Sequence, residues 1–422
     1  MKKTLALVLA LLLVFSLAAC SSGEKTTTDT SSTTDTTNTT DTTDTTDTTD
    51  TTDTTDTTDT TDTEDTTGGV DYDNPIYIGV LDAFTGDRAS NGEYSKEGAD
   101  MAMNEINENG GVMGRAIELV YEDDQGTEAG ATNAFQKIVS EHDLAAICLN
   151  KFSSMVLAME QFVADEGIPA ICCGSSVSLE ASSTYNLYST RKSDSGSGVT
   201  IANYCQELGM TKVAILHAPD ALGTGMTPVI LEAFEDLGIE AVSVQQFSAE
   251  EKNFAPYVAK IIDSGCDGII AIAQQQEAGL IMSALKEANL DVPCIGNSAF
   301  AQQVAMETSG GACDGWYSVS AFSPTAQEEP TKTWIADYEA LYGRKPDMTS
   351  ACMYDAVKLF CAAMEETQST EWDDINEWLH NVSDYQGVTS TYTYAGNPML
   401  STSEFVVRIE GDSAEVVALV KS

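Results

Sequence analysis

Short apolar runs alternate with amphipathic segments from residue 76 onwards, and this pattern predicts strands alternating with helices. Residues 76–81 are apolar and rich in β-branched side chains, which is typical of a buried parallel strand. Over 94–109, apolar residues recur at helical spacing, and Gly110 and Gly111 then predict the end of a helix. The alternation continues with predicted strands at 117–121, 145–149, 168–172 and 185–190 and helices at 129–140 and 155–166.

A second series of the same kind begins at Lys212. It predicts strands at 213–217, 241–246, 268–273 and 293–296, and helices at 227–237, 254–264, 278–288 and, later, 352–366. Two such series favour two α/β lobes, each with a parallel sheet covered by helices on both faces. Ligands of such sheets bind beyond the carboxyl ends of the strands, so the site is expected in the loops 82–92, 150–154, 173–178, 218–225, 274–277 and 297–300.

The first residues have the pattern of an export signal. Lys2 and Lys3 precede an apolar run at 5–17 that is too short to span a bilayer comfortably, so residues 1–19 are interpreted as a signal peptide. Leu17, Ala18, Ala19 and Cys20 resemble the bacterial lipobox, which implies a lipid on Cys20 after cleavage. The alternative is an ordinary secretory signal with an incidental cysteine. Either interpretation places the mature chain outside the cytoplasm.

An Asp-Thr-Thr repeat runs from Asp41 to Asp62, without a large apolar residue. Such a segment cannot form a core, so residues 20–72 are predicted to be the lipidated cysteine followed by a disordered linker. As a flexible coil it would reach roughly 40 Å. A spacer of this kind suits a thick cell wall and favours a Gram-positive source. The sequence leaves open whether the threonines carry sugars.

The charge balance excludes several classes of partner. The chain has 20 basic and 66 acidic residues, a net charge of −46. This charge repels phosphate backbones and anionic lipid headgroups, so neither nucleic-acid binding nor a basic membrane-binding face is expected. A hydrophobic content of 42% excludes a globally disordered chain.

No metal and no cofactor are predicted, because the three histidines and ten cysteines show no ligand spacing. Cys148, Cys172 and Cys294 lie in or at the ends of predicted apolar strands and are interpreted as small buried residues. The neighbours Cys172 and Cys173 are expected to point to opposite faces of their strand. No disulfide is assigned.

No enzymatic activity is predicted. The sequence Gly196-Ser197-Gly198 lacks the third glycine and the following acid of a dinucleotide-binding fingerprint. His217 ends a predicted strand, but no G-x-S-x-G elbow surrounds a nearby serine, so ordinary hydrogen bonding is expected of it.

Several short motifs occur in the order and spacing of one known family. Gly98-Ala99, Glu105-Ile106-Asn107, Gly110-Gly111 and Gly114 resemble the first-helix signature of type I periplasmic binding proteins, in the leucine/isoleucine/valine-binding branch that serves ABC importers. Residues 122–125 and 165–169 fit the same family, and the resemblance spans 74–410.

The resemblance implies a fold of two Rossmann-like α/β lobes with parallel central sheets, joined by a hinge of three segments. The chain is expected to cross between lobes near Asp194, Ser320 and Thr391. The first lobe would then comprise 73–194 and 321–390, and the second 195–320 and 391–422.

The resemblance also implies site residues. The ligand carboxylate is expected at the hydroxyls and amides of Ser153 and Ser154, and this is compatible with these serines capping the helix that follows. The ligand ammonium is expected at Gly174, Ser175 and Ser176. The remaining matching positions are Asp194 at the hinge, Asn91 in the first lobe, and Leu222, Gln274 and Ser298 in the second.

Two departures from the family pattern concern the ligand. The family places an acid at the position of Ser298, as counter-ion to the ligand ammonium, and a buried ammonium without an anion is costly. Asp194 and Asp220 are the candidate replacements. Asn91, Leu222 and Gln274 stand where the branch has aromatic residues, which predicts a more polar pocket.

The sequence therefore predicts an extracytoplasmic, lipid-anchored receptor that closes on a small amino acid and delivers it unmodified to an ABC permease and its ATPase. A monomer is expected, anchored to the outer face of the cytoplasmic membrane. The alternatives are a receptor for a neutral amide or urea-like solute, a sensor that reports to a separate partner, and a hydrolase.

Overall fold

The computed structural model describes residues 69–411 and 413–421. The predicted signal peptide at 1–19, the lipidation site Cys20 and most of the predicted linker at 20–72 lie outside the described residues. The first strand begins at Asp71, so the last residues of the predicted linker belong to the folded part. No helix among the described residues has the length and apolar character needed to cross a membrane.

The first sheet has the strand order β2-β1-β3-β4-β5, and every neighbouring pair is parallel. Every residue of β3 is buried, as expected for a parallel strand that is covered on both faces. The strands are β1 (Asp71–Asp82), β2 (Arg115–Asp123), β3 (Leu144–Leu149), β4 (Ala170–Cys172) and β5 (Leu187–Ser189).

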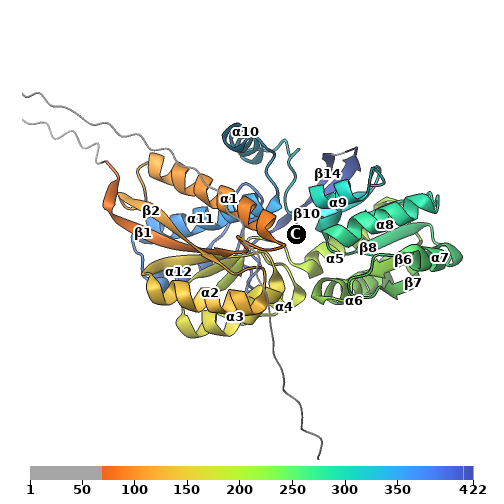
Figure 1. Ribbon diagram of the computed structural model, residues 1–422, viewed down its shortest axis with the longest axis horizontal. Coiled ribbons are helices and arrows are strands. Elements are labelled where there is room, and N and C mark those ends of the chain that lie inside the picture. The colour runs from red at the N-terminus through yellow and green to blue at the C-terminus, as the bar shows by residue number, and fades with distance from the viewer. Residues whose placement is uncertain (1–68, 412, 422) are drawn as a thin grey trace, which may run out of the picture. The chain divides into compact units, whose positions relative to one another are not determined.

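Helices cover both faces of this sheet (Figure 1). On one face pack α2 (Glu128–Glu141) and α3 (Ser153–Glu166), and on the other α1 (Ala89–Glu108) and α11 (Met348–Thr367). The helix α11 comes from late in the chain and packs closely against α1. A Cβ atom on Gly98 of α1 would lie 2.0 Å from the carbonyl oxygen of Ser350, so only glycine fits this contact.

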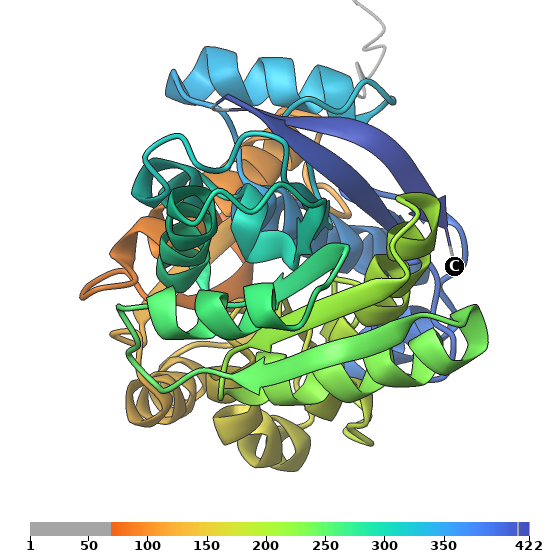
Figure 2. The same cartoon turned by 90° about the vertical axis from the view of Figure 1, so that its right-hand side faces the viewer.

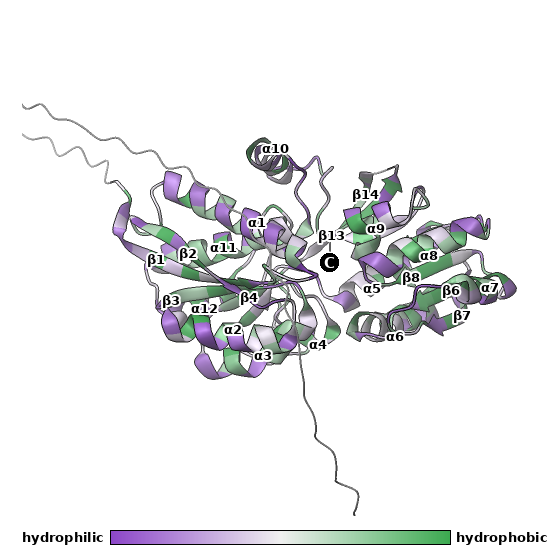
Figure 3. Cartoon of the chain, in the orientation of Figure 1, coloured by the Kyte–Doolittle hydropathy of each residue, from purple (hydrophilic) through white to green (hydrophobic). Residues whose placement is uncertain are grey.

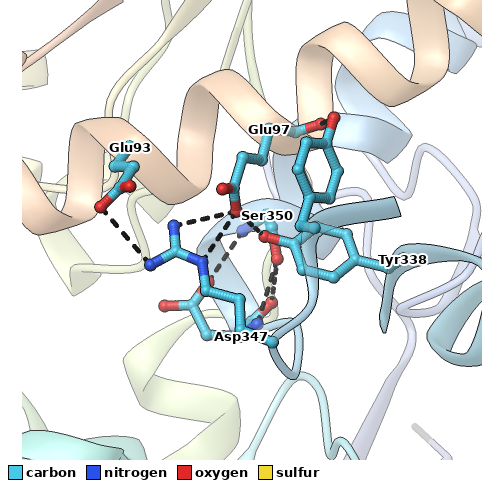
Figure 4. Close-up of polar contacts among 7 residues, drawn as sticks. Glu93, Glu97, Tyr338, Asp347 and Ser350 are labelled. Atoms are coloured by element: carbon cyan, nitrogen blue, oxygen red, sulfur yellow. Dashed lines mark hydrogen bonds and ion pairs between the residues drawn. The ribbon is translucent and has the colours of Figure 1, made fainter. Parts of the chain in front are cut away.

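Polar contacts hold the segment before α11 against α1 (Figure 4). Glu97 of α1 accepts a hydrogen bond from the hydroxyl of Tyr338, in α10 (Thr331–Tyr342), and another from Nε of Arg344 at 3.1 Å. Asp347 then caps α11 by accepting from the backbone N–H of Ser350 at 2.9 Å. These contacts place residues 331–367 with the first sheet.

The second sheet has the order β14-β13-β10-β9-β8-β6-β7. Its strands from β6 to β10 pair in parallel, whereas β13 and β14 are antiparallel to their neighbours. The strands are β6 (Lys212–His217), β7 (Glu240–Gln246), β8 (Gly268–Ile272), β9 (Cys294–Gly296), β10 (Tyr317–Ser320), β13 (Ser403–Glu410) and β14 (Ser413–Lys421).

The second sheet is also covered on both faces (Figure 2). On one face pack α5 (Asp194–Glu207) and α6 (Ala221–Leu237), and on the other α7 (Ala255–Asp263) and α8 (Gln275–Glu287). Strand β8 between them is buried throughout and hydrophobic in Figure 3. The shorter elements are α4 (Val177–Glu180), the 3₁₀ helix η1 (Ser298–Ala301), α9 (Gln303–Thr308), α12 (Trp372–Asn381), β11 (Tyr385–Gln386) and β12 (Thr391–Tyr392).

The predicted fold class is confirmed: this is an α/β chain with two mainly parallel sheets. Two helices differ most from the prediction. Helix α6 starts at Ala221 rather than at 227, because Asp220 caps it by accepting from Gly223 N–H at 3.1 Å. Helix α5 was not predicted; its first turns contain Gly196 and Gly198, which have a low helix propensity.

The third change of sheet occurs later than the predicted crossing near Thr391. Ser189 at the end of β5 donates its N–H to the carbonyl of Pro398 at 2.8 Å and accepts from Leu400 N–H at 3.0 Å. The chain therefore stays with the first sheet until Leu400 and joins the second at Ser403. These backbone hydrogen bonds carry no pattern in the sequence, which is why the crossing was misplaced.

The cysteines behave as small core residues. Cys148, Cys172 and Cys294 are buried, and the nine cysteines among the described residues are all free thiols. Cys172 and Cys173 belong to different hydrophobic clusters, which confirms that they point to opposite faces of the sheet.

Candidate ligand-binding site

The first-lobe candidates lie at one edge of the first sheet. Ser153 begins α3 just after β3, Gly174 follows β4, and Asp194 follows β5. Because these strands are parallel, their carboxyl ends meet at one edge. The topology therefore brings together loops that are separated in the sequence.

The hydroxyl oxygen of Ser153 joins two of these loops. It accepts hydrogen bonds from the backbone N–H groups of Ser175 and Ser176, both at 3.2 Å. The serine does not cap α3, whose N-cap is Phe152 with no side-chain cap bond, so the capping interpretation was wrong. Since the oxygen acts as acceptor, the hydroxyl proton remains available to another acceptor. Ser154, the next residue, is exposed.

The loop after β4 fits tightly against Ser153. A Cβ atom on Gly174 would lie 2.6 Å from a methyl carbon of Leu179 and 3.1 Å from the Ser153 hydroxyl oxygen. Ser189 donates its hydroxyl to the Gly174 carbonyl at 2.6 Å, and Ser176 caps α4. The backbone of this loop is thus held in place from several sides.

Asp194 is a buried acid at the start of α5. Its backbone N–H donates to the carbonyl of Ser175 at 2.6 Å. Burial raises the pKa of its carboxyl to about 7, although Arg191 and the Ser175 hydroxyl act in the opposite direction. Burial therefore favours the neutral form of this carboxyl more than water does, and a cation next to it would favour the charged form.

The second-lobe candidates lie at the matching edge of the second sheet. Asp220 accepts from Nε2 of Gln274 at 2.8 Å, so these two exposed residues pair with each other. Leu222 is partly buried and packs on the core cluster beneath α5 and α6. Ser298 begins η1, and its hydroxyl oxygen accepts from Nη2 of Arg191 at 3.3 Å.

Arg191, which the sequence did not single out, joins the two edges. It lies between β5 and α5, and its Nη1 donates to the carbonyl of Cys173 at 3.5 Å while Nη2 reaches Ser298. One side chain thus contacts the ends of β4 in the first sheet and of β9 in the second. A signal was present: a basic residue follows the last strand of the first series in a strongly acidic chain.

Two further basic residues lie near Ser153. The guanidinium carbon of Arg88 lies 4.1 Å from the centre of the Phe152 ring, and Nζ of Lys151 lies 5.5 Å from it. Burial lowers the pKa of Lys151; Asp347 and Asp82 act against this shift, and the nearby Arg191 adds to it. Asn91 lies in the first turn of α1 and donates to the Arg88 carbonyl at 3.4 Å.

The site thus offers hydroxyls, backbone amides and cations, groups that suit a small polar or anionic solute. His217 places Nδ1 2.8 Å from the Ala218 carbonyl oxygen, an ordinary structural hydrogen bond. Within 69–411 and 413–421, no three His, Cys, Asp or Glu side chains are grouped so as to hold a metal ion.

Comparison with known proteins agrees with this arrangement. A Leu/Ile/Val-binding protein homolog of Brucella abortus is 23% identical over 331 residues, covering 77% of this chain and 88% of that one. The branched-chain amino acid transporter substrate-binding protein of Streptococcus pneumoniae, solved with isoleucine, superposes with a TM-score of 0.75 at 23% identity and covers 83% of this chain and all of its own.

A solute-binding protein of an ABC transporter from R. palustris, solved with benzoate, superposes with a TM-score of 0.72 at 19% identity and covers 82% of this chain and 97% of its own. The family model described as periplasmic binding protein matches residues 75–413. With its two sheets, its facing strand ends and this match, the chain belongs to the periplasmic binding protein family.

Proposed function

We propose that this chain is the extracytoplasmic solute-binding protein of an ABC importer, and that it takes up a small amino acid or a related carboxylate. One observation carries the proposal: the Ser153 hydroxyl and the Ser175–Ser176 amides lie at the edge where Arg191 reaches across to Ser298. Hydrogen-bond donors of both lobes can then contact the same solute. A ligand that contacts both lobes stabilises the closed form.

The relatives support this assignment. They include Leu/Ile/Val-binding protein homologs and a protein named for leucine, isoleucine, valine, threonine and alanine binding. In the proposed division, the lobes are close to 73–194 with 321–390 and 195–320 with 391–422, except that the chain up to Leu400 pairs with the first lobe, and the hinge lies between the lobes. Ser153, Ser154, Gly174, Ser175, Ser176, Asp194, Asn91, Leu222, Gln274 and Ser298 are the proposed ligand-binding set. No chemical change of the solute is part of this function.

The partners follow from the same proposal. A membrane permease with its ATPase would recognise the closed form, and the lipid on Cys20 would keep the monomeric receptor at the outer face of the cytoplasmic membrane of a Gram-positive cell. Expression of the full chain should give a membrane-bound product that incorporates a labelled fatty acid. Cys20→Ala should abolish the labelling, and unchanged labelling would refute the anchor.

Thermal unfolding of the purified protein with leucine, isoleucine, valine, alanine and threonine tests the ligand class. A ligand that binds only the folded state adds about 2.7 kcal/mol of stability at a concentration one hundred times its Kd. We expect a rise in Tm with one or more of these amino acids or with their carboxylate analogues. A flat response to both groups would contradict the proposal.

A neutral solute is the second candidate, because Ser298 stands where the family pattern has an acid. Acetamide and urea should be included in the same screen. Stabilisation by these two alone would favour the neutral ligand.

A further inference from the structure

The charge at the expected ammonium end of the site is reversed. Where the family resemblance implies an acid that pairs with a ligand ammonium, this chain has Ser298, and its hydroxyl receives the guanidinium of Arg191. A ligand ammonium at this point would meet the positive charge of Arg191. Asp194 and Glu404 lie near enough for Arg191 to lower their pKa values, but neither forms an ion pair with it. Like charges in a partly buried site repel more strongly than in water, because the surroundings screen them less.

Several N–H donors of the Arg191 guanidinium are not used within the part of the protein that the structure describes. A guanidinium carries five N–H donors and no acceptor. Only two weak bonds are made, at 3.5 Å to Cys173 and 3.3 Å to Ser298, and Nε is buried without a partner among the described residues. An unpaired buried donor destabilises a protein, and a planar carboxylate fits the guanidinium fork with two parallel hydrogen bonds.

Two more cations lie at the same edge. Lys151 is close enough to Arg191 for its charge to lower the lysine pKa, and Arg88 buries an unpartnered Nη1. Of the ion pairs formed among residues 69–411 and 413–421, none includes Arg88, Lys151 or Arg191. Other basic residues of the chain also lack an ion pair, but Arg191 and Arg88 each bury a guanidinium nitrogen without a partner among the described residues.

The acids that face these cations bind to other donors. Asp82 accepts from Ser95 and from the Ala83 backbone, and Asp347 accepts from Ser350. Glu404 accepts from the Ser197 hydroxyl at 2.5 Å, and Asp194 is hydrogen-bonded to Ser175. Burial raises the pKa of all four carboxyls and also that of Asp124, which faces Arg88 and accepts from Gly126 N–H at 2.8 Å. None of these acids forms an ion pair with Arg88, Lys151 or Arg191.

We propose that the ligand is a small organic acid with a net negative charge, whose carboxylate is held by Arg191 with Lys151 close by. The inference rests on the proposed solute-binding function and narrows its substrate class: the solute lacks an ammonium that balances its carboxylate. The zwitterionic branched-chain amino acids are then weaker ligands than their counterparts without the amino group.

Two matched pairs of probes test this by calorimetry. Leucine and 4-methylpentanoate differ only by the ammonium group, and benzoate and benzamide differ by the carboxylate. We expect 4-methylpentanoate to bind at least tenfold more tightly than leucine, and benzoate at least tenfold more tightly than benzamide. Leucine binding more tightly than 4-methylpentanoate overturns the inference and leaves the importer function standing. No binding by any of the four, with no response to the amino-acid panel, overturns both.

A pair of variants tests the role of Arg191. Arg191→Gln should weaken benzoate or 4-methylpentanoate binding by tenfold or more, since a charged hydrogen bond is lost. Arg408→Gln is the matched control, because it makes the same change at a residue of β13 that pairs with Glu410. Equal affinity of the Arg191→Gln and Arg408→Gln proteins refutes the assignment.

Circular dichroism first establishes that both variants fold. If Arg191→Gln does not fold, two other experiments test the proposal. One measures benzoate binding to Lys151→Gln, and the other measures how benzoate binding to the unaltered protein depends on salt. Affinity should then fall as salt rises and should fall in Lys151→Gln, because salt screens the attraction between charges. Affinity that is unchanged in both experiments overturns the proposal.

Discussion

Replacing Ser153 by alanine removes the oxygen that joins two loops of the site. The Ser153 hydroxyl accepts from the N–H groups of Ser175 and Ser176 at 3.2 Å each, and these two residues are only 5% and 3% exposed. A typical intramolecular hydrogen bond contributes about 0.5–1.5 kcal/mol net, so Ser153→Ala should lower the free energy of unfolding by about 1–3 kcal/mol. Urea unfolding without ligand measures this change.

The same substitution should weaken ligand binding. In the proposed site the hydroxyl proton of Ser153 points to the ligand, and its loss leaves a ligand acceptor unpaired at about 1–3 kcal/mol. This corresponds to about 5- to 150-fold in Kd, which calorimetry with the tightest ligand of the screen resolves. The two effects are separate, because unfolding is measured without ligand.

Ser178→Ala is the control for both measurements. Ser178 is an exposed serine of α4, beyond the same loop. Its replacement should change the unfolding free energy by less than about 0.5 kcal/mol. If Ser153→Ala loses stability but keeps its affinity, Ser153 positions the loop and does not contact the ligand. If it matches Ser178→Ala in both assays, the hydrogen bonds to Ser175 and Ser176 have no energetic role.

Three further predictions concern stability. Burial raises the pKa of Asp194 from 3.8 to about 7, so folding takes up a proton between these values; this contribution is complete at low pH and lost as pH rises through 7. Asp194→Asn should therefore flatten the fall of the unfolding free energy between about pH 4 and pH 7 in urea titrations, and an unchanged slope would contradict this. Gly98→Ala should lower the free energy of unfolding by at least about 3 kcal/mol, because the new Cβ would overlap the backbone of α11. Asn104→Ala, on the exposed side of α1, is the control and should leave the thermal unfolding almost unchanged. Asp355→Asn should lower the free energy of unfolding, measured with urea, by at least about 2 kcal/mol, because the Asp355 carboxylate accepts four hydrogen bonds from residues 388–392. Asp374→Asn, at an exposed position, is the control and should not lower it.

The candidate site was only partly predictable. Parallel strands have their carboxyl ends at one edge, so the loops that hold Ser153, Gly174 and Ser298 could be named from the strand pattern alone. Whether these residues bind the ligand stays a prediction. Arg191 and Lys151 were missed because a basic side chain in a loop looks the same in sequence whether or not an acid in another segment pairs with it.

The sequence by itself determined the local elements. An apolar run such as Leu144–Leu149, or the helical spacing of apolar residues in α1, is a pattern among residues that are close in the sequence. Such local patterns predicted most strands and helices to within a few positions. Only the tertiary structure decided that β13 and β14 add antiparallel strands to the second sheet and that α11 packs on α1. It also decided that Arg191 reaches from the first sheet to Ser298. These features join residues far apart in the chain, and such contacts are selected by the packing of the whole core and leave no periodic trace in the segments that make them.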